Sequence, residues 1–245
     1  PAALMNAAAF AAFERALAAV PANPEEPLII VSPAPYIGYA AIEAGQKWYT
    51  NVDAEDKPVD LSQDPEAWSF HPKGFADFIQ ALGRANRRKF IILSGDVHYG
   101  FTANANCAVH TASGSKTFSI VQFVSSALKN ASSTLQAAKS IAPILVTQFR
   151  DDFLLGHMDK DRYRLKTLRE LRGSPDPYPG NWELQIQWSY SFMGGVDVVE
   201  DNNVGYLKIS NAEANQTLYT RATSFTAGIR WADIPLKKPL PLPKI

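Results

Sequence analysis

The stretch Phe90-Ile91-Ile92-Leu93-Ser94-Gly95-Asp96-Val97-His98-Tyr99-Gly100-Phe101 is the part of the sequence that decides the fold. Its apolar start predicts a strand buried on both faces, as in a parallel sheet. Ligands of open α/β sheets gather at the carboxyl ends of the strands, where Asp96 and His98 follow. Because side chains alternate along an extended backbone, we expect these two residues to face one site. A carboxylate and an imidazole are common transition-metal ligands, so the stretch predicts a metal or catalytic site.

Other segments predict a layered α/β fold. Apolar residues have helical spacing over residues 3–20, and residues 28–31 predict a second buried strand. The same helix-then-strand order recurs over residues 72–94, with Phe75, Phe78, Ile79 and Leu82 on one helix face. Residues 133–172 predict a helical stretch that forms a lid or a covering helical hairpin. Further strands are predicted at residues 116–124, 184–188, 196–199, 204–209 and 217–222.

We therefore expect one layered β-sandwich of mixed sheets, flanked by helices, over residues 1–233. The early elements should build one sheet, and the late hairpins should extend it. Residues 234–245 are rich in proline and lysine and predict an extended or disordered tail. The long connection at residues 36–70 is rich in aromatic residues, which favours either a wall of the active site or ordinary surface packing.

Three short motifs carry a resemblance to a known family. They are Glu66-Ala67-Trp68, the run from Leu93 to Gly100, and Ser125-Ser126-Ala127-Leu128-Lys129-Asn130. Their order resembles the C-terminal half of the PhoD-like alkaline phosphatases, within the calcineurin-like metallophosphoesterase superfamily. Residues 202–209 fit the closing strands of that family less specifically. The resemblance covers roughly residues 10–225 and implies a metallophosphoesterase-like sandwich.

The resemblance implies metal-dependent hydrolysis of phosphate mono- or diesters through a metal-activated water. Two metal ions, drawn from iron, calcium, manganese or zinc, would neutralise the phosphoryl oxygens and lower the pKa of the water to about 7. His98 would bind one metal ion and Asp96 the other, and the carboxylate would favour iron, manganese or calcium over zinc. The substrate would contact side chains next to these ligands, namely Tyr99, Ser125, Ser126 and His71.

The other superfamily motifs are missing from this sequence. Gly95-Asp96 is its only Gly-Asp pair, so no Gly-Asp-x-x-Asp motif is present. Gly180-Asn181-Trp182-Glu183 has tryptophan where the family has histidine, and it follows the last motif instead of preceding it. The sequence starts at Pro1 in a helical pattern. We therefore expect the C-terminal part of a longer polypeptide, with the N-terminal half of the metal site as a possible partner.

The composition and the net charge of the chain indicate which kinds of partner are favoured. The 245 residues are 46% hydrophobic and 20% charged, which is typical of a globular protein. The formal net charge is zero, so no overall field favours nucleic acid or an anionic membrane. The basic cluster of Arg84, Arg87, Arg88 and Lys89 predicts a solvated turn. No apolar stretch reaches the roughly 18–20 residues of a membrane helix. The one cysteine, Cys107, is predicted to be structural and leaves the cellular compartment open.

Alternatives remain for the residues and for the function. His98 is either a metal ligand or a histidine that caps a loop, and Asp96 is either a ligand or a turn carboxylate. His110 in a predicted polar loop and His157 in a predicted helix are weaker candidates. A serine hydrolase would need a Gly-x-Ser-x-Gly motif, which Ser113-Gly114-Ser115 does not match. A non-catalytic module that keeps only the scaffold is the main alternative function.

Overall fold

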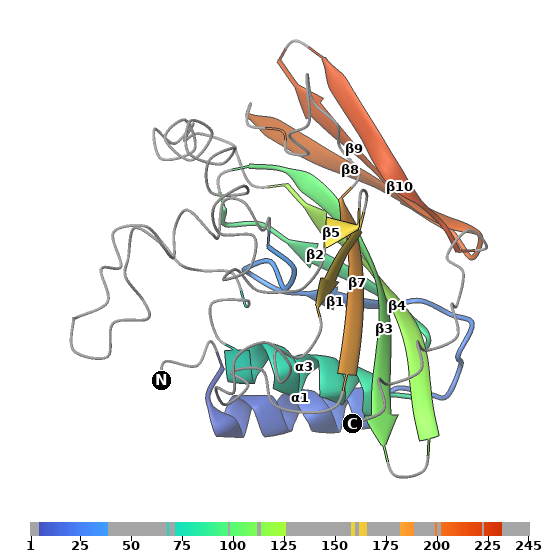
Figure 1. Ribbon diagram of the computed structural model, residues 1–245. Coiled ribbons are helices and arrows are strands. Elements are labelled where there is room, and N and C mark those ends of the chain that lie inside the picture. The colour runs from blue at the N-terminus through green and yellow to red at the C-terminus, as the bar shows by residue number, and fades with distance from the viewer. Residues whose placement is uncertain are drawn as a thin grey trace.

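The computed structural model describes residues 5–38, 68, 72–97, 99–111, 114–125, 158–159, 162–165, 182–188, 199, 202–221 and 223–231. Over these residues the chain forms an α/β fold with two separate β-sheets (Figure 1). Residues 39–67, the motif residues 126–130 and the tail 234–245 lie outside the described residues, and so does most of the stretch predicted to be a helical hairpin.

The larger sheet has seven strands in the order β1-β2-β4-β3-β7-β6-β5. Their bounds are β1 Leu28–Val31, β2 Lys89–Ser94, β3 Phe101–Thr111, β4 Gly114–Val124, β5 Met158–Asp159, β6 Arg162–Leu165 and β7 Trp182–Trp188. The strands β1, β2 and β4 run parallel to one another, and each remaining pair of neighbours is antiparallel. The predicted strands at residues 28–31, 90–93, 116–124 and 184–188 are confirmed.

Two helices, α1 (Ala7–Ala19) and α3 (Pro72–Arg84), pack against each other and cover one face of this sheet (Figure 1). The side chain of Asn6 begins α1 by accepting a hydrogen bond from the Ala9 amide at 2.9 Å. Phe13 of α1 stacks on Phe78 of α3, with ring centroids 5.2 Å apart. The predicted apolar face of α3 is confirmed, because all four of its side chains are buried in the core.

The late strands form a second sheet in the order β10-β9-β8, with β8 at Asn203–Ile209, β9 at Glu213–Thr220 and β10 at Ser224–Arg230. The prediction that they extend the first sheet is therefore wrong. The small sheet packs on β2 and β4, on the face of the large sheet opposite the helices. Its inner residues make an apolar cluster with β2 and β4, formed by Ile91, Val121, Phe123, Ala214, Ile229 and Trp231.

Strand β2 is buried on both faces, as the sequence predicts. Phe90 and Ile92 face the helices, whereas Ile91 faces the small sheet, and all three are fully buried. The prediction of a second buried strand at β1 is wrong, although its composition is similar. Ile29 is 48% exposed and Val31 is 78% exposed, and β1 is the last strand of the large sheet among the described strands.

Three other predictions differ from the structure. Strand β3 occupies residues that were expected to be a polar loop around His110. Met158–Asp159 and Arg162–Leu165 are the short strands β5 and β6, not helix. The predicted strand at residues 217–222 begins earlier, at Glu213, and β10 was not predicted. Within the described residues, no helix is both long enough and apolar enough to cross a membrane.

Candidate functional site

The carboxyl ends of the three parallel strands lie side by side at one edge of the large sheet. The Ser32 amide, just after β1, donates a hydrogen bond to the Leu93 carbonyl of β2 at 2.9 Å. On the other side of β2, the Ser125 amide donates to the Ser94 carbonyl at 3.2 Å. The edge therefore joins the segments that follow β1, β2 and β4, which is the place where ligands bind in sheets of this kind.

Asp96 lies at this edge, two residues beyond β2. Its φ angle is +60°, in the left-handed region that aspartate adopts more readily than most residues. Its side chain is exposed to solvent. The strand ends before Asp96, so the alternation rule that placed Asp96 and His98 on one side does not extend to this residue. His98 lies outside the described residues, and a site shared by the two side chains stays a prediction.

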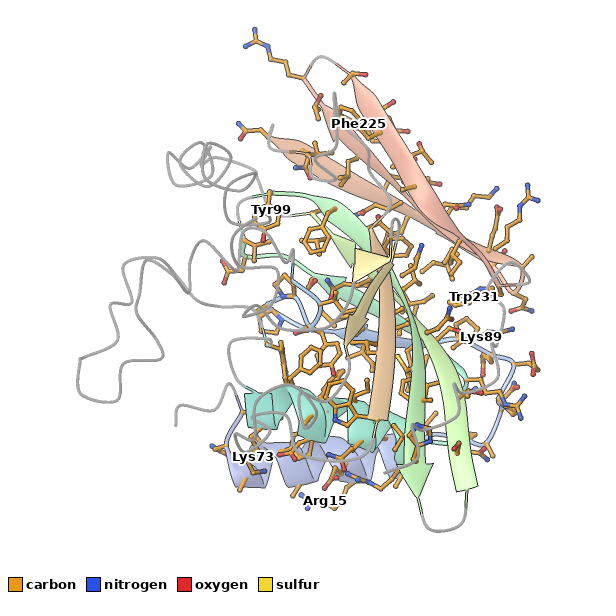
Figure 2. The ribbon with its side chains drawn as sticks, viewed as in Figure 1. Arg15, Lys73, Lys89, Tyr99, Phe225 and Trp231 are labelled. Atoms are coloured by element: carbon orange, nitrogen blue, oxygen red, sulfur yellow. The ribbon has the colours of Figure 1, made fainter. Side chains whose placement is uncertain are left out.

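Tyr99, a predicted substrate contact, is buried in the main core (Figure 2). Its ring stacks on Phe101 with the centroids 5.6 Å apart. The next residue, Gly100, pairs through its backbone with Val199, with N···O distances of 2.8 and 2.7 Å. The described packing of Tyr99 supports a role in the core, and its contact with a substrate stays a prediction.

Ser125, the other described substrate candidate, connects the two sheets. Its hydroxyl donates to Oδ1 of Asn203 in β8 at 2.9 Å. Beside it, Nε2 of Gln216 donates to the Val124 carbonyl at 3.3 Å, and Oε1 of Gln216 accepts from Thr102 at 3.1 Å. Asn203 and Gln216 are 3% and 2% exposed, so this polar contact is shielded from water. The hydrogen bond gives Ser125 a structural role, whatever else it contacts.

Gln122 was not singled out from the sequence, although it is the one amide inside the apolar end of β4. Its Oε1 accepts from the amides of Tyr36 and Ile37 at 2.8 and 2.9 Å, and its Nε2 donates to the Ile37 carbonyl. Trp68 also holds this segment, by donating from Nε1 to the Ser32 hydroxyl at 3.3 Å. These bonds fix the chain after β1 at the carboxyl edge.

His110 lies at the opposite end of the large sheet. Its Nδ1 is 2.6 Å from the Ser115 hydroxyl across the β3–β4 hairpin. The register pairs His110 with Ser115, whereas the other end of the same hairpin pairs Phe101 with Val124. His110 is thus far along the strands from Asp96. His71, His157 and Ser126 lie outside the described residues.

The basic cluster also lies at this opposite end and is largely paired. Arg84 forms an ion pair with Glu14. Arg87, which is buried, bonds Glu26 at 2.9 Å, and Lys89 bonds Glu25 at 3.2 Å. The first pair joins the two helices to each other, and the other two join β2 and the turn that precedes it to the turn before β1. The cluster is therefore more than the solvated turn that the sequence predicts.

Cys107 lies in the middle of β3 and is buried in the main core. Burial raises the pKa of its thiol well above the ordinary value, because the thiolate would lose its hydration. The protonated thiol fits the structural role that the sequence predicts.

Two polar side chains among the described residues lie at the carboxyl edge of the parallel strands, and one of them could hold a metal ion. The exposed carboxylate of Asp96 is a hard oxygen donor at the ends of the parallel strands. Two residues before it, the Ser94 hydroxyl is buried and has no hydrogen-bond partner among the described residues. The described residues contain no cluster of three or more histidine, cysteine, aspartate or glutamate side chains. Asp96 therefore fits as one ligand of a metal ion but does not make a site by itself.

A comparison of the chain with protein-family models, with curated proteins and with solved structures finds no match.

Proposed function

We propose that this chain forms part of a metal-dependent phosphate-ester hydrolase similar to the PhoD-like alkaline phosphatases. The observation that supports the proposal best is the position of Asp96. It follows the central parallel strand β2, at an edge where β1 and β4 also end. Its carboxylate is exposed there and is held on a backbone with a defined, uncommon conformation.

In this proposal Asp96 and His98 are the ligands that the chain contributes to a two-metal centre. Such a centre, when bound, supplies positive charge to the phosphoryl oxygens and a nucleophilic water at neutral pH. Asp96 holds its metal ion at the carboxyl ends of the strands. The fold would then be the metallophosphoesterase sandwich, with the small sheet and the large sheet as its two layers.

In this proposal the segment after β1, from Ser32 to Ile37, forms one side of the substrate-binding site. The hydrogen bonds from Gln122 and Trp68 hold the backbone from Ser32 to Ile37 against β4 and α3. A phosphate ester bound beside Asp96 would lie between this wall and Ser125. The buried ring of Tyr99 supports the segment that leads away from His98.

Elemental analysis of the purified chain, paired with its intact mass, tests the proposal. We expect bound metal that is lost in both His98→Ala and Asp96→Asn. Asparagine keeps the size of aspartate and its tolerance of positive φ, so this variant removes the charge and leaves the turn in place. Glu213→Gln, which neutralises a half-buried carboxylate on the small sheet that pairs with Lys208 at 3.2 Å, is the control for loss of a carboxylate charge away from Asp96 and should keep the metal.

Hydrolysis of p-nitrophenyl phosphate and of bis-p-nitrophenyl phosphate then measures activity on a monoester and a diester. The two ligand variants should lose any activity that the wild-type chain has, and Glu213→Gln should retain it. Metal that persists in both ligand variants would contradict the proposal. Absence of metal from the wild-type chain, with an intact mass that matches these residues, would mean that the chain carries only half of a site and is inactive by itself, or is a non-catalytic module that keeps the scaffold.

A further inference from the structure

One end of the small sheet packs tightly on the connection between β2 and β3, which contains Asp96. The connection ends at Gly100. A Cβ atom at Gly100 would lie 2.8 Å from Cδ1 of Leu218 in β9 and 3.2 Å from Oδ1 of Asn203 in β8. Because glycine has no such atom, the small sheet approaches the backbone here more closely than it could approach another residue.

The end of β4 is in equally close contact with the small sheet. A Cβ atom at Gly205 of β8 would lie 2.9 Å from the Cβ atom of Ser125. The Ser125 hydroxyl donates to Oδ1 of Asn203 at 2.9 Å, and Nε2 of Gln216 donates to the Val124 carbonyl at 3.3 Å. Two buried side-chain amides of the small sheet thus bond the residues at the end of β4.

Backbone hydrogen bonds hold both ends of the connection that contains Asp96. At its start, the Gly95 amide donates to the Pro33 carbonyl beyond β1 at 3.2 Å. At its end, Gly100 exchanges two hydrogen bonds with Val199, which lies shortly before β8 in the sequence. The first end is therefore held by the large sheet, and the second by the segment that leads to the small sheet.

The small sheet is a layer of its own that can detach as a unit (Figure 1). Its central strand β9 pairs with β8 and with β10, and these bonds persist if the layer leaves the large sheet. Side chains hold the far end of this layer on β2 and β4, among them Ile229. Ile229 pairs with Ala214, whereas Leu218, next to Gly100, lies at the other end of β9. Units of this kind open cooperatively in native proteins.

We propose that the small sheet holds the carboxyl edge in place, so that Gly100 and Ser125 are released when the small sheet detaches. Asn203 and Gly205 are the positioning residues, because they make the close contacts with Gly100 and Ser125. For a metal site the inference rests on the proposed function: detachment would separate the connection that contains Asp96 from the end of β4. The attachment itself requires no metal ion.

Hydrogen exchange of the metal-free full chain, measured for single amides by NMR, tests the proposal. Ile229→Val removes one carbon under the small sheet, and Ile79→Val, the matched control, removes one carbon from the core on the helix side. In Ile229→Val, the amides of Gly100 and Ser125 should exchange faster by the same factor as those of β9, about 2–10-fold. In Ile79→Val they should keep their wild-type rates, because the helices stay packed when only the small sheet detaches.

Gly205→Ala is a second variant, which acts at the contact itself. Its methyl group would crowd Ser125, so the amides of Gly100 and Ser125 should again exchange faster. Gly83→Ala is its control, because it adds the same methyl group to an equally tight contact between α3 and β3. Equal rates at Gly100 and Ser125 in the two glycine variants would overturn the proposal.

Two further results would overturn it. The first is faster exchange of β9 in Ile229→Val with unchanged exchange of Gly100 and Ser125, which would mean that other contacts hold the edge. The second is exchange of β9 at the rate of β2 in every variant, which would mean that the small sheet does not detach by itself. Elemental analysis decides the metal-binding proposal separately, because none of these exchange rates depends on bound metal.

Discussion

Gln122 in β4 bonds the backbone of Ile37 in both directions. Its Oε1 accepts from the Ile37 amide at 2.9 Å, and its Nε2 donates to the Ile37 carbonyl at 2.5 Å. Both residues are fully or almost fully buried. The side-chain amide of Gln122 thus satisfies backbone groups of Ile37, as a neighbouring strand would, although Ile37 lies beyond the end of β1.

Gln122→Leu should lower the free energy of unfolding by about 2–4 kcal/mol. Leucine has a similar volume but leaves the buried amides of Tyr36 and Ile37 and the Ile37 carbonyl without this partner, and each orphaned group costs about 1–3 kcal/mol. Urea denaturation measures the change. Gln80→Leu is the control, because Gln80 on α3 is only half-buried. Equal effects of the two substitutions would contradict the assignment.

Ser125→Ala should lower the free energy of unfolding by about 1 kcal/mol, because the hydroxyl donates to the buried Oδ1 of Asn203 between the sheets. A double-mutant cycle with Asn203→Ala measures the coupling of the two side chains, which we expect to be about 0.5–1.5 kcal/mol. A coupling near zero would show that the hydrogen bond does not hold the sheets together. Ser224→Ala, at an exposed position at the start of β10, is the control.

Gly83→Ala should destabilise the protein by about 1–3 kcal/mol, although alanine is the better helix former. A Cβ atom at Gly83 would lie 2.7 Å from Cγ2 of Val109, where α3 crosses β3. Val109→Ala removes both methyl groups but leaves the Cβ atom of residue 109, 2.8 Å from the new atom, so the double variant should regain part of the loss and be more stable than the sum of the two single changes predicts. Thermal unfolding of all four proteins checks this. Simple additivity would mean that the helix shifts to make room.

Cys107 should make stability fall at high pH. Burial raises the pKa of its thiol above the ordinary value of 9.0, so the folded chain keeps the proton that the unfolded chain loses. The associated stability is complete below about pH 9 and declines above it, by up to about 1.4 kcal/mol per pH unit. Denaturation of wild-type protein and Cys107→Ala across pH 8–10.5 isolates this contribution from those of other groups. Parallel curves for the two proteins would contradict it.

The spacing of apolar residues within one segment predicted correctly which faces of α3 and β2 are buried. The helical spacing of Phe75, Phe78, Ile79 and Leu82 states which face of α3 is inside. The apolar run at residues 90–93 predicts that both faces of β2 are buried. The run at residues 28–31 has a similar composition, yet Ile29 and Val31 are exposed, because the coverage of a strand depends on what packs against it and not on its own residues.

The elements that were missed have weak side-chain signals. In the middle of β3 the buried residues are Ala103 and Ala105 and the residues between and after them are Asn104 and Asn106, so this part of the strand lacks large or β-branched side chains. The position of the late strands was wrong for a different reason. Alternation in β8 and β9 identifies an inner and an outer face, but it does not state whether the sheet continues an existing one or lies on top of it.

For the candidate site, the sequence located Asp96 at the edge of the parallel strands but did not give its left-handed backbone. It also placed Ser125 at the same edge without indicating its partner, because Asn203 is separated from it by a long stretch of chain. Contacts of this kind depend on how two sheets pack. A pattern within one segment contains no information about them.

Because β2 is buried on both faces, different parts of the protein should unfold at different free energies. Phe90 and Ile92 belong to the helix-side core, and Ile91 belongs to the cluster under the small sheet. If the small sheet detaches as one cooperative unit, Ile91 becomes wet while the backbone of β2 keeps its hydrogen bonds to β1 and β4. Native-state exchange should then show two tiers, in which β8–β10 exchange through a partial opening and β2 exchanges only when the whole chain unfolds.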